Sequence, residues 1–211
     1  IPVQVNLNRR ADSVMIDLAA GGLEGKIGEV QAVFGVYGNG LFNNGIHMID
    51  LLRMLVGEVE SVQALDHGYI NEGPLLDDGN LAFVLYLMNG ITATFLPLRF
   101  SCYRENALDI WGTKGRLEIL QEGLLMRFSP RLACRSVHES YELAADSSTI
   151  ISTAYGHSMY KMYDDLYSAL TNKNPTCSTV GSALCTEEVI HAVIRSAQLG
   201  GKPVACAMFD N

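Results

Sequence analysis

The sequence lacks an uncharged apolar run of about eighteen residues, the minimum that a membrane-spanning helix needs. Its start at Ile1-Pro2 lacks the basic and apolar segments of a signal peptide. It is also short of positive charge, because 15 Lys and Arg face 23 Asp and Glu, a formal net charge of −8. A surface that follows nucleic-acid phosphates needs clustered Lys and Arg. We therefore expect a cytosolic protein with no membrane or nucleic-acid partner, and a small molecule or another protein instead.

The cysteines lack the C-x-x-C spacing typical of zinc sites and redox pairs. There are five, an odd number, and they are scattered along the chain. We expect reduced, structural thiols and no metal site. The chain also starts with Ile rather than Met, so we expect it to be processed or a piece of a longer protein.

Hydrophobic residues are plentiful, at 48% of the 211 residues against 18% charged, which is enough for a sizeable core. Hydrophobic spacing and turn residues predict alternating strands and helices in the first part. They are a strand at 3–8, a helix capped by Asp12 and stopped at Gly21-Gly22, a strand at 27–37, a helix at 45–55 and a strand at 59–65.

From residue 81 the pattern changes to antiparallel sheet. Two apolar runs, 81–88 and 91–98, are joined by Asn89-Gly90, the strongest short hairpin signal. Further strands are predicted at 107–111, 116–120 and 124–128, with a less certain one at 137–143, and helices at 155–170 and 182–199. We predict one α+β domain over 1–211, a largely antiparallel open sheet with helices packed on one face.

Both alternating sets of side chains in 81–88 are apolar, so neither face of this strand favours water. Helices can cover one face, and a large apolar patch on the other usually marks an interface. We predict face-to-face packing of sheets in a homo-oligomer. The alternative is that the tail helices cover the second face within one subunit.

The segment 38–50 passes from a strand to a helix and places Asn43, His47 and Asp50 on one stripe, because residues three and four apart stack on a helix. This stripe is the predicted site of chemistry. Gly38-x-Gly40 also resembles the start of a dinucleotide-binding turn. However, the third glycine of that motif would fall at Asn43, and a meander follows in place of βαβ units. We interpret these glycines as serving a sharp turn and a close approach.

Several segments together resemble the C-terminal domain of the Gfo/Idh/MocA oxidoreductases. They are Asn8-Arg-Arg10 with Asp12, Gly25-Lys-Ile-Gly28, Gly45-Ile-His-Met-Ile-Asp-Leu-Leu52 with Gly57, Trp111-Gly-Thr-Lys-Gly115, Ala183-Leu184 to Ala192 with Ser196-Ala197, and Gly201-Lys-Pro-Val204. The resemblance implies an α+β domain that forms the substrate pocket and oligomerises through its open sheet. It also implies that NAD or NADP is bound by a preceding Rossmann domain, which carries the catalytic lysine in a Glu-Lys-Pro motif absent here. This piece alone is expected to be inactive, with no cofactor-binding residues of its own.

The resemblance assigns catalytic roles to His47 and to the position of Asn43, where the family often has Asp. An imidazole titrates near working pH, whereas an amide can hydrogen-bond a hydroxyl but cannot accept its proton. The alternative for His47 is a buried side chain satisfied by Asp50. For Asn43 it is a helix cap, a favoured role of Asn. Asp50 itself is expected to hold His47 or to pair with Arg53 rather than to touch substrate.

Six further residues are predicted to bind substrate: Arg9, Tyr37, Asn39, Asn44, Tyr155 and His157. The guanidinium of Arg9 is suited to bind carboxylates, phosphates or vicinal hydroxyls. The alternative interpretation of Arg9, and of Arg10, is a solvated side chain at the end of a strand without a role in binding. The others flank the glycine turn or open the helix at 155–170, where aromatic and Asn residues also occur without function.

The leading hypothesis is the substrate-binding and oligomerisation domain of an NAD(P)-dependent oxidoreductase acting on a sugar, sugar nucleotide or polyol. One rival is a ligand-binding or scaffolding homologue that has lost the catalytic Asp and is not an enzyme. A second rival is a cofactor-free isomerase or lyase that uses His47 and Asp50.

Overall fold

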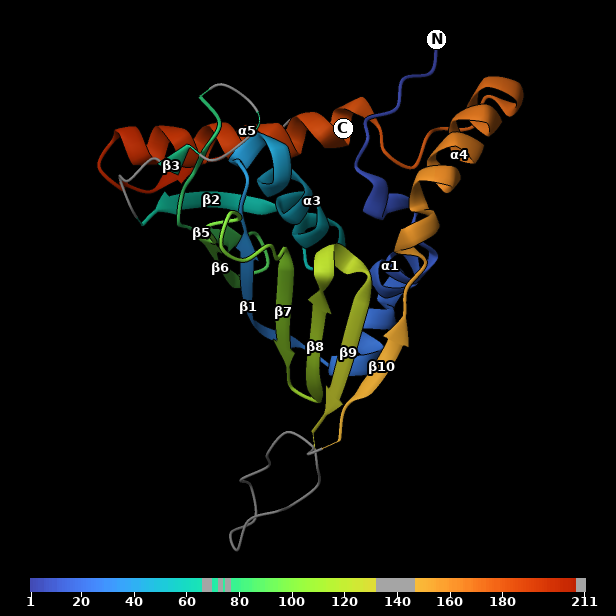
Figure 1. The fold of residues 1–211 in the computed structure, drawn as a ribbon, viewed down its shortest axis with the longest axis horizontal. Coiled ribbons are helices and arrows are strands. Elements are labelled where there is room, and N and C mark those ends of the chain that lie inside the picture. The colour runs from blue at the N-terminus through green and yellow to red at the C-terminus, as the bar shows by residue number, and fades with distance from the viewer. Residues whose placement is uncertain (66–69, 72–73, 75–76, 132–146, 208–211) are drawn as a thin grey trace, which may run out of the picture.

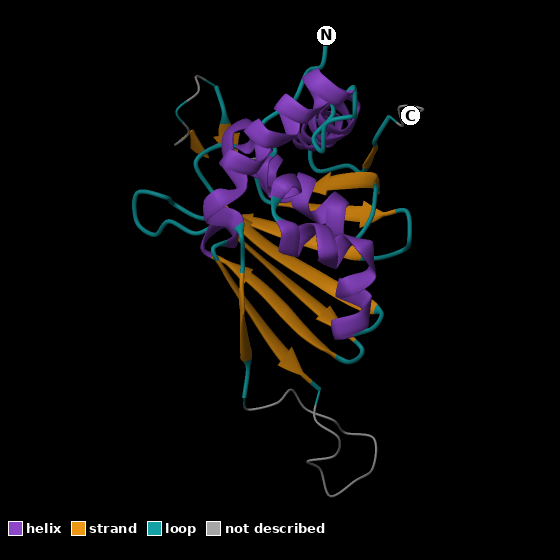
Figure 2. Cartoon of the chain, turned by 90° about the vertical axis from the view of Figure 1, so that its right-hand side faces the viewer, coloured by secondary structure: helices purple, strands orange, loops and turns teal. Residues whose placement is uncertain are grey.

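A computed structural model describes residues 1–65, 70–71, 74, 77–131 and 147–207 of the chain. One large sheet runs through the molecule, with helices gathered on one of its faces (Figures 1 and 2). Its nine strands follow the order β10-β9-β8-β7-β1-β6-β5-β2-β11, and a small second sheet pairs β3 with β4. Every neighbouring pair is antiparallel except β1 and β6, which run parallel. The α+β class and the largely antiparallel open sheet are therefore confirmed.

The strands of the large sheet are β1 (Val30–Tyr37), β2 (Val59–Ala64), β5 (Phe83–Leu87), β6 (Thr92–Pro97), β7 (Ala107–Gly112), β8 (Gly115–Leu120), β9 (Leu125–Pro130), β10 (Thr149–Ser152) and β11 (Val204–Ala205). The small sheet consists of β3 (Ile70–Asn71) and β4 (Gly79–Asn80). The hairpin predicted at Asn89-Gly90 is confirmed as β5 and β6, with Gly90 at φ 84°.

The helices are α1 (Ser13–Asp17), α2 (Leu23–Ile27), α3 (Ile46–Leu55), α4 (Ser158–Asn172) and α5 (Val180–Gln198). Short 3-10 turns are η1 (Asn8–Ala11), η4 (Gln121–Gly123) and η5 (Tyr155–His157), and π turns are η2 (Leu18–Gly22) and η3 (Leu41–Gly45). Asp12 caps α1 as predicted, because its carboxylate accepts from the amides of Val14 and Met15.

The local structure departs from the predictions in three places. The predicted strand at 3–8 does not form, because this segment runs beside the connection from α4 to α5, where Val5 N donates to Ser178 O, rather than along a sheet edge. The first helical segment is interrupted at Gly21 (φ 107°), near the predicted stop, but a second short helix, α2, follows, so the next strand starts at Val30 rather than at residue 27. The edge strand β10 was not predicted. The predicted strand at 137–143 lies outside the described residues.

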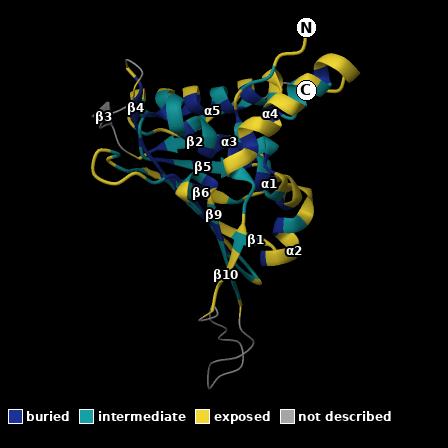
Figure 3. Ribbon diagram, turned by 45° about the vertical axis from the view of Figure 1, so that its right-hand side comes forward, coloured by how far each residue is buried: buried dark blue, intermediate teal, exposed yellow. Residues whose placement is uncertain are grey.

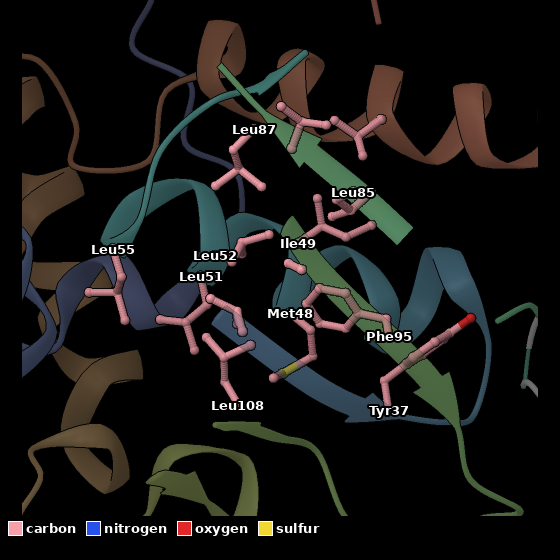
Figure 4. Packing of buried hydrophobic residues seen from close by; sticks show 14 of the residues in the cluster. Tyr37, Met48, Ile49, Leu51, Leu52, Leu55, Leu85, Leu87, Phe95 and Leu108 are labelled. Carbon is pink, nitrogen blue, oxygen red and sulfur yellow. The ribbon is translucent and has the colours of Figure 1, made fainter. Parts of the chain in front are cut away.

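The core fills the space between α3 and the sheet (Figure 4). Leu51 and Leu52 of α3 are fully buried, as are Leu85, Phe95 and Leu108 on the facing side of the sheet. Burial alternates along each strand: in β5, Phe83, Leu85 and Leu87 are buried, whereas the residues between them are only half-buried. The packed face therefore anchors α3 against the sheet, and the start of α3 is held at the end of β1.

The opposite face of the sheet carries apolar side chains that the described residues do not bury. Leu96 of β6 and Trp111 of β7 are each 38% exposed, and the exposed parts of the strands appear in Figure 3. A shallow hollow of about 360 Å³ on this face is lined by Phe34 and Val36 of β1, Leu120 of β8 and neighbouring residues. Beside it, Arg116 forms ion pairs with Asp109 and Glu118 and lies over the ring of Trp111. We call this surface the open face.

Candidate functional site

The candidate site begins where β1 turns into α3. Gly38 is required here, because a Cβ would lie 2.4 Å from Cδ1 of Phe100 and 2.6 Å from the carbonyl oxygen of Leu98. The next two residues have left-handed backbones, with φ of 63° at Asn39 and 101° at Gly40. Gly adopts this conformation freely and Asn tolerates it. The sharp turn and close approach predicted for these glycines are thus present, and they direct the chain into η3 and α3.

The start of this helical segment is capped by a residue that is distant in sequence. The carboxylate of Asp78 accepts hydrogen bonds from the amides of Phe42 (2.8 Å) and Asn43 (2.9 Å), and Oδ1 of Asn80 accepts from the amide of Gly40 (2.9 Å). A pyrophosphate would need these same donors. Because a carboxylate already occupies them, the residues present do not fit a dinucleotide phosphate at Gly38-x-Gly40.

Asn43 is therefore not the cap. Its side-chain Nδ2 donates to the carbonyl oxygen of Asn39 (3.1 Å) and approaches Oδ1 of Asn44 (3.4 Å), and all three asparagines are half-buried. The amide of Asn43 thus supports the left-handed turn, while its Oδ1 accepts no hydrogen bond from the described residues. This oxygen can accept from a ligand hydroxyl.

His47 lies one helical turn beyond Asn43 and is half-buried. Burial lowers the pKa of its imidazole from 6.5 to about 4, with the positive charge of Arg9 acting in the same direction and Glu122 opposing both. The imidazole is therefore neutral at physiological pH, and the described residues offer it no hydrogen bond. A neutral imidazole with free nitrogens can accept a hydrogen bond or a proton from a hydroxyl.

The alternative that Asp50 satisfies His47 is not observed. The Asp50 carboxylate is bound by Arg10 through three contacts of 2.7–3.0 Å, and it also accepts from the hydroxyl of Thr186 (3.2 Å). Arg53 is at 4.0 Å, so the predicted pairing with it is only marginal. Arg10 is thus part of a buried ion pair that ties α3 to the N-terminal segment, not a solvated strand end.

Arg9 is 3% exposed and lies beside His47. Its Nη2 donates to the carbonyl oxygen of Glu122 (2.6 Å), and its guanidinium carbon lies 4.9 Å from the ring centre of Tyr155. Its buried Nε has no partner among the described residues. Burial lowers the pKa of this guanidinium, although Arg stays protonated in proteins. A buried cation with one unused donor is suited to a ligand oxygen.

The turn η4 forms the other side of this group. Gln121, Glu122 and Gly123 have φ of 52°, 63° and 108°, so two non-glycine residues adopt left-handed backbones. Such strain persists only where the surroundings impose it, and it is frequent at functional sites. Sequence reasoning missed Glu122 and Asp78 as parts of the site. No local signal links either acidic residue to His47.

The predicted substrate residues fall into three sets. Arg9 lies against Tyr155 and its charge acts on His47, whereas Asn39 and Asn44 lie with Asn43. His157 is exposed at the start of α4, with no contact to the other candidates described. Tyr37 is fully buried, and its hydroxyl donates to the carbonyl oxygen of Leu81 (2.7 Å) and accepts from the Leu81 amide (2.9 Å). Tyr37 is therefore a core residue that fixes the end of β1, and we remove it from the proposed ligand contacts.

No group of three or more His, Cys, Asp or Glu side chains able to hold a metal ion occurs among the described residues. None of the helices in the described part of the chain is long and apolar enough to span a membrane. The described cysteines, Cys102, Cys177, Cys185 and Cys206, are free thiols.

Comparison with known proteins supports the resemblance. Residues 35–118 match the family model for the GFO/IDH/MocA C-terminal domain. A comparison with curated protein sequences found no match. The fold is shared with levoglucosan dehydrogenase in complex with NADH (TM-score 0.74, 18% identity, 99% of this chain and 67% of that one).

Two further solved structures share the fold at similar identity. They are the aldose-aldose oxidoreductase from Caulobacter crescentus complexed with glycerol (TM-score 0.70, 17% identity, 97% of this chain and 64% of that one) and a super-repressor mutant of Gal80p from Saccharomyces cerevisiae (TM-score 0.70, 15% identity, 97% and 66%). The chain thus spans about two thirds of the length of the structures it matches. The predicted resemblance to Gfo/Idh/MocA C-terminal domains is confirmed, for the family motif over 35–118 and for the fold over nearly the whole chain.

Proposed function

We propose that residues 1–211 are the substrate-binding and oligomerisation domain of an NAD(P)-dependent oxidoreductase that acts on a sugar, sugar nucleotide or polyol. The observation that carries the proposal is a neutral His47 whose pKa the charge of Arg9 helps to lower, one helical turn from Asn43. Neither the His47 imidazole nor Oδ1 of Asn43 accepts a hydrogen bond from the described residues. Two matched structures are named as a dehydrogenase or oxidoreductase of sugars, one of them with NADH bound.

NAD(P), held mainly by a preceding domain, supplies the hydride acceptor at the carbon that bears the hydroxyl. The residues of this chain bind the substrate and handle its proton. His47 accepts the hydrogen bond of the reacting hydroxyl and helps to remove its proton as the hydride leaves the same carbon. Asn43 and Asn44 hydrogen-bond neighbouring hydroxyls, and Arg9 with Tyr155 forms the wall on the other side. Asn43 cannot accept the proton, so that role falls to His47 and to the lysine implied in the preceding domain.

The open face is the proposed contact between subunits. Its apolar hollow is bordered by the charged cluster of Arg116, Asp109 and Glu118, an arrangement that resembles the apolar centre and polar rim of protein interfaces. In this proposal, two sheets pack face to face in a cytoplasmic homo-oligomer.

The test uses the full-length gene product with a panel of sugars and polyols, followed by nicotinamide absorbance. We expect turnover in the parent, loss of about a hundredfold or more in kcat for His47→Ala, and no effect of Tyr163→Phe at an exposed position of α4. The 211-residue piece alone should show no turnover. Equal rates in His47→Ala and the parent would refute the assignment of His47.

A second candidate function, a ligand-binding or scaffolding homologue without catalysis, is favoured by one observation. The position where the family often has Asp is Asn43, and its amide is already used to hold Asn39. One matched structure is also named as a super-repressor mutant of Gal80p rather than as an enzyme. Binding of cofactor and sugar by the full-length product without any nicotinamide reduction would favour this candidate. The third hypothesis, a cofactor-free enzyme with a His47–Asp50 pair, finds no support, because Asp50 is bound to Arg10.

A further inference from the structure

Asp78 is a buried carboxylate whose hydrogen bonds reach across the fold to the candidate site. It is 2% exposed and forms no ion pair with the described residues. Its two oxygens accept from the amides of Phe42 and Asn43. Burying an ionised carboxylate is unfavourable unless hydrogen bonds or charges compensate. Here the compensation comes from two backbone donors at the start of a helical segment, where the helix dipole also favours negative charge.

The shape of the turn is adapted to this carboxylate. A Cβ on Gly40 would lie only 2.1 Å from Oδ2 of Asp78, so Gly40 leaves the space that the carboxylate fills. Asn80, two residues later, accepts from the amide of Gly40 itself (2.9 Å). The segment 78–80, which ends in β4, therefore accepts hydrogen bonds from three backbone amides of the turn, those of residues 40, 42 and 43.

This turn sets the direction of the site residues. Asn39 and Gly40 have left-handed backbones, and the first helical turn, η3, is a π turn rather than an α turn. The left-handed backbone of Asn39 and the π turn are locally unfavourable and need external support. If the acceptor is removed, the amides of Phe42 and Asn43 lose their partners and the turn can rewind toward α-helical geometry. Rewinding would rotate Asn43 with respect to His47, whose helix is fixed separately by the Arg10–Asp50 pair.

We propose that Asp78 is a positioning residue, which holds the π turn so that Asn43 and His47 present their free acceptors to the same ligand. The proposal rests on the function assigned above to that site. Asp78 itself touches no ligand, because its oxygens are occupied and buried. Asn80 assists by holding Gly40.

The test compares Asp78→Ala, Asp78→Asn and the neighbouring control Asp77→Asn, which changes an exposed residue, in the full-length gene product. Hydrogen exchange by mass spectrometry is followed in peptides that cover residues 39–45 and, as an internal reference, 115–120. We expect Asp78→Ala to speed exchange about tenfold or more in 39–45 but not in 115–120. Asp78→Asn, which retains one acceptor, should restore part of the protection. Asp77→Asn should match the parent.

The kinetic arm separates positioning from a merely structural role. Loss of alignment should lower kcat about tenfold or more in Asp78→Ala, with a smaller change in KM, and Asp78→Asn should recover part of kcat. If Asp78→Ala does not fold, Asp78→Asn decides by the same readouts. Unchanged exchange in 39–45, or unchanged kcat with altered exchange, would overturn the proposal. A parent without dehydrogenase activity would refute the proposed function instead. The role of Asp78 would then be decided by hydrogen exchange in 39–45 and by comparing the sugar affinity of Asp78→Ala with that of the parent.

Discussion

The lowered pKa of His47 predicts a specific dependence of stability on pH. The folded state disfavours protonation of this imidazole, so between pH 6.5 and about 4 the unfolded chain binds a proton that the folded chain does not. The free energy of unfolding should therefore fall as the pH falls through this range and level off below it. At about 1.4 kcal/mol per pH unit, the change from 6.5 to about 4 corresponds to a loss of roughly 3 kcal/mol.

Urea unfolding at half-unit steps from pH 7.5 to pH 4, in the parent and in His47→Gln, measures this contribution. The variant cannot take up the proton in either state. Between pH 7.5 and pH 4 its free energy of unfolding should therefore fall by up to about 3 kcal/mol less than that of the parent. His157→Gln, which removes an exposed imidazole, is the matched control and should follow the parent. Arg9→Met removes the second cause of the lowering, so it should raise the pKa of His47 while burial still keeps it below 6.5. The reasoning is refuted if direct NMR titration of His47 gives a pKa of 6.5 or higher, or if His47→Gln keeps the slope of the parent.

Three further predictions concern stability and assembly. Arg10→Met should lower the free energy of unfolding, measured by urea unfolding, by about 3 kcal/mol, because it leaves the buried Asp50 carboxylate without its main partner. Arg104→Met, which removes an exposed ion pair, is the control and should lower the free energy of unfolding by less than about 1 kcal/mol. Tyr37→Phe should cost about 1–3 kcal/mol in the same assay and leave sugar affinity unchanged, because it removes the hydrogen bonds of this buried hydroxyl to the Leu81 backbone. Leu96→Asp on the open face should convert the proposed oligomer to monomers, measured as a lower molecular mass in light scattering, without lowering the melting temperature of the monomer. An unchanged mass would contradict the proposed interface.

The sequence predicted those parts of the fold that local patterns control. The turn Asn89-Gly90 favours a two-residue hairpin by its own backbone preferences, and the hairpin of β5 and β6 forms there. Asp12 could be recognised as a cap because cap and capped amides are only two and three residues apart. The short helix α2 after Gly21 was missed, because the burial of Leu23 and Ile27 in the core, which favours a second helical segment there, is visible only in the fold.

The candidate site was only partly predictable, because its geometry depends on contacts between residues that are distant in sequence. His47 and Asn43 could be selected from one helical stripe. The capping carboxylate of Asp78 comes from 35 or more residues away, and Glu122 reaches Arg9 across a separation of 113 residues. Tyr37 was assigned to the ligand because it flanks the glycine turn. Only the fold shows that its hydroxyl is used by the Leu81 backbone.

Asn43 stands where the resemblance implies an Asp, and the way this turn is built favours the amide. The left-handed Asn39 leaves its carbonyl oxygen to be satisfied by a donor, and Nδ2 of Asn43 supplies it. A carboxylate at position 43 could not donate this hydrogen bond, and it would add a second negative charge near Asp78, which is bound to the same residue's amide. The amide is therefore favoured by the turn itself. The proposed proton acceptor is therefore His47, four residues later, which is a neutral imidazole to which the described residues offer no hydrogen bond.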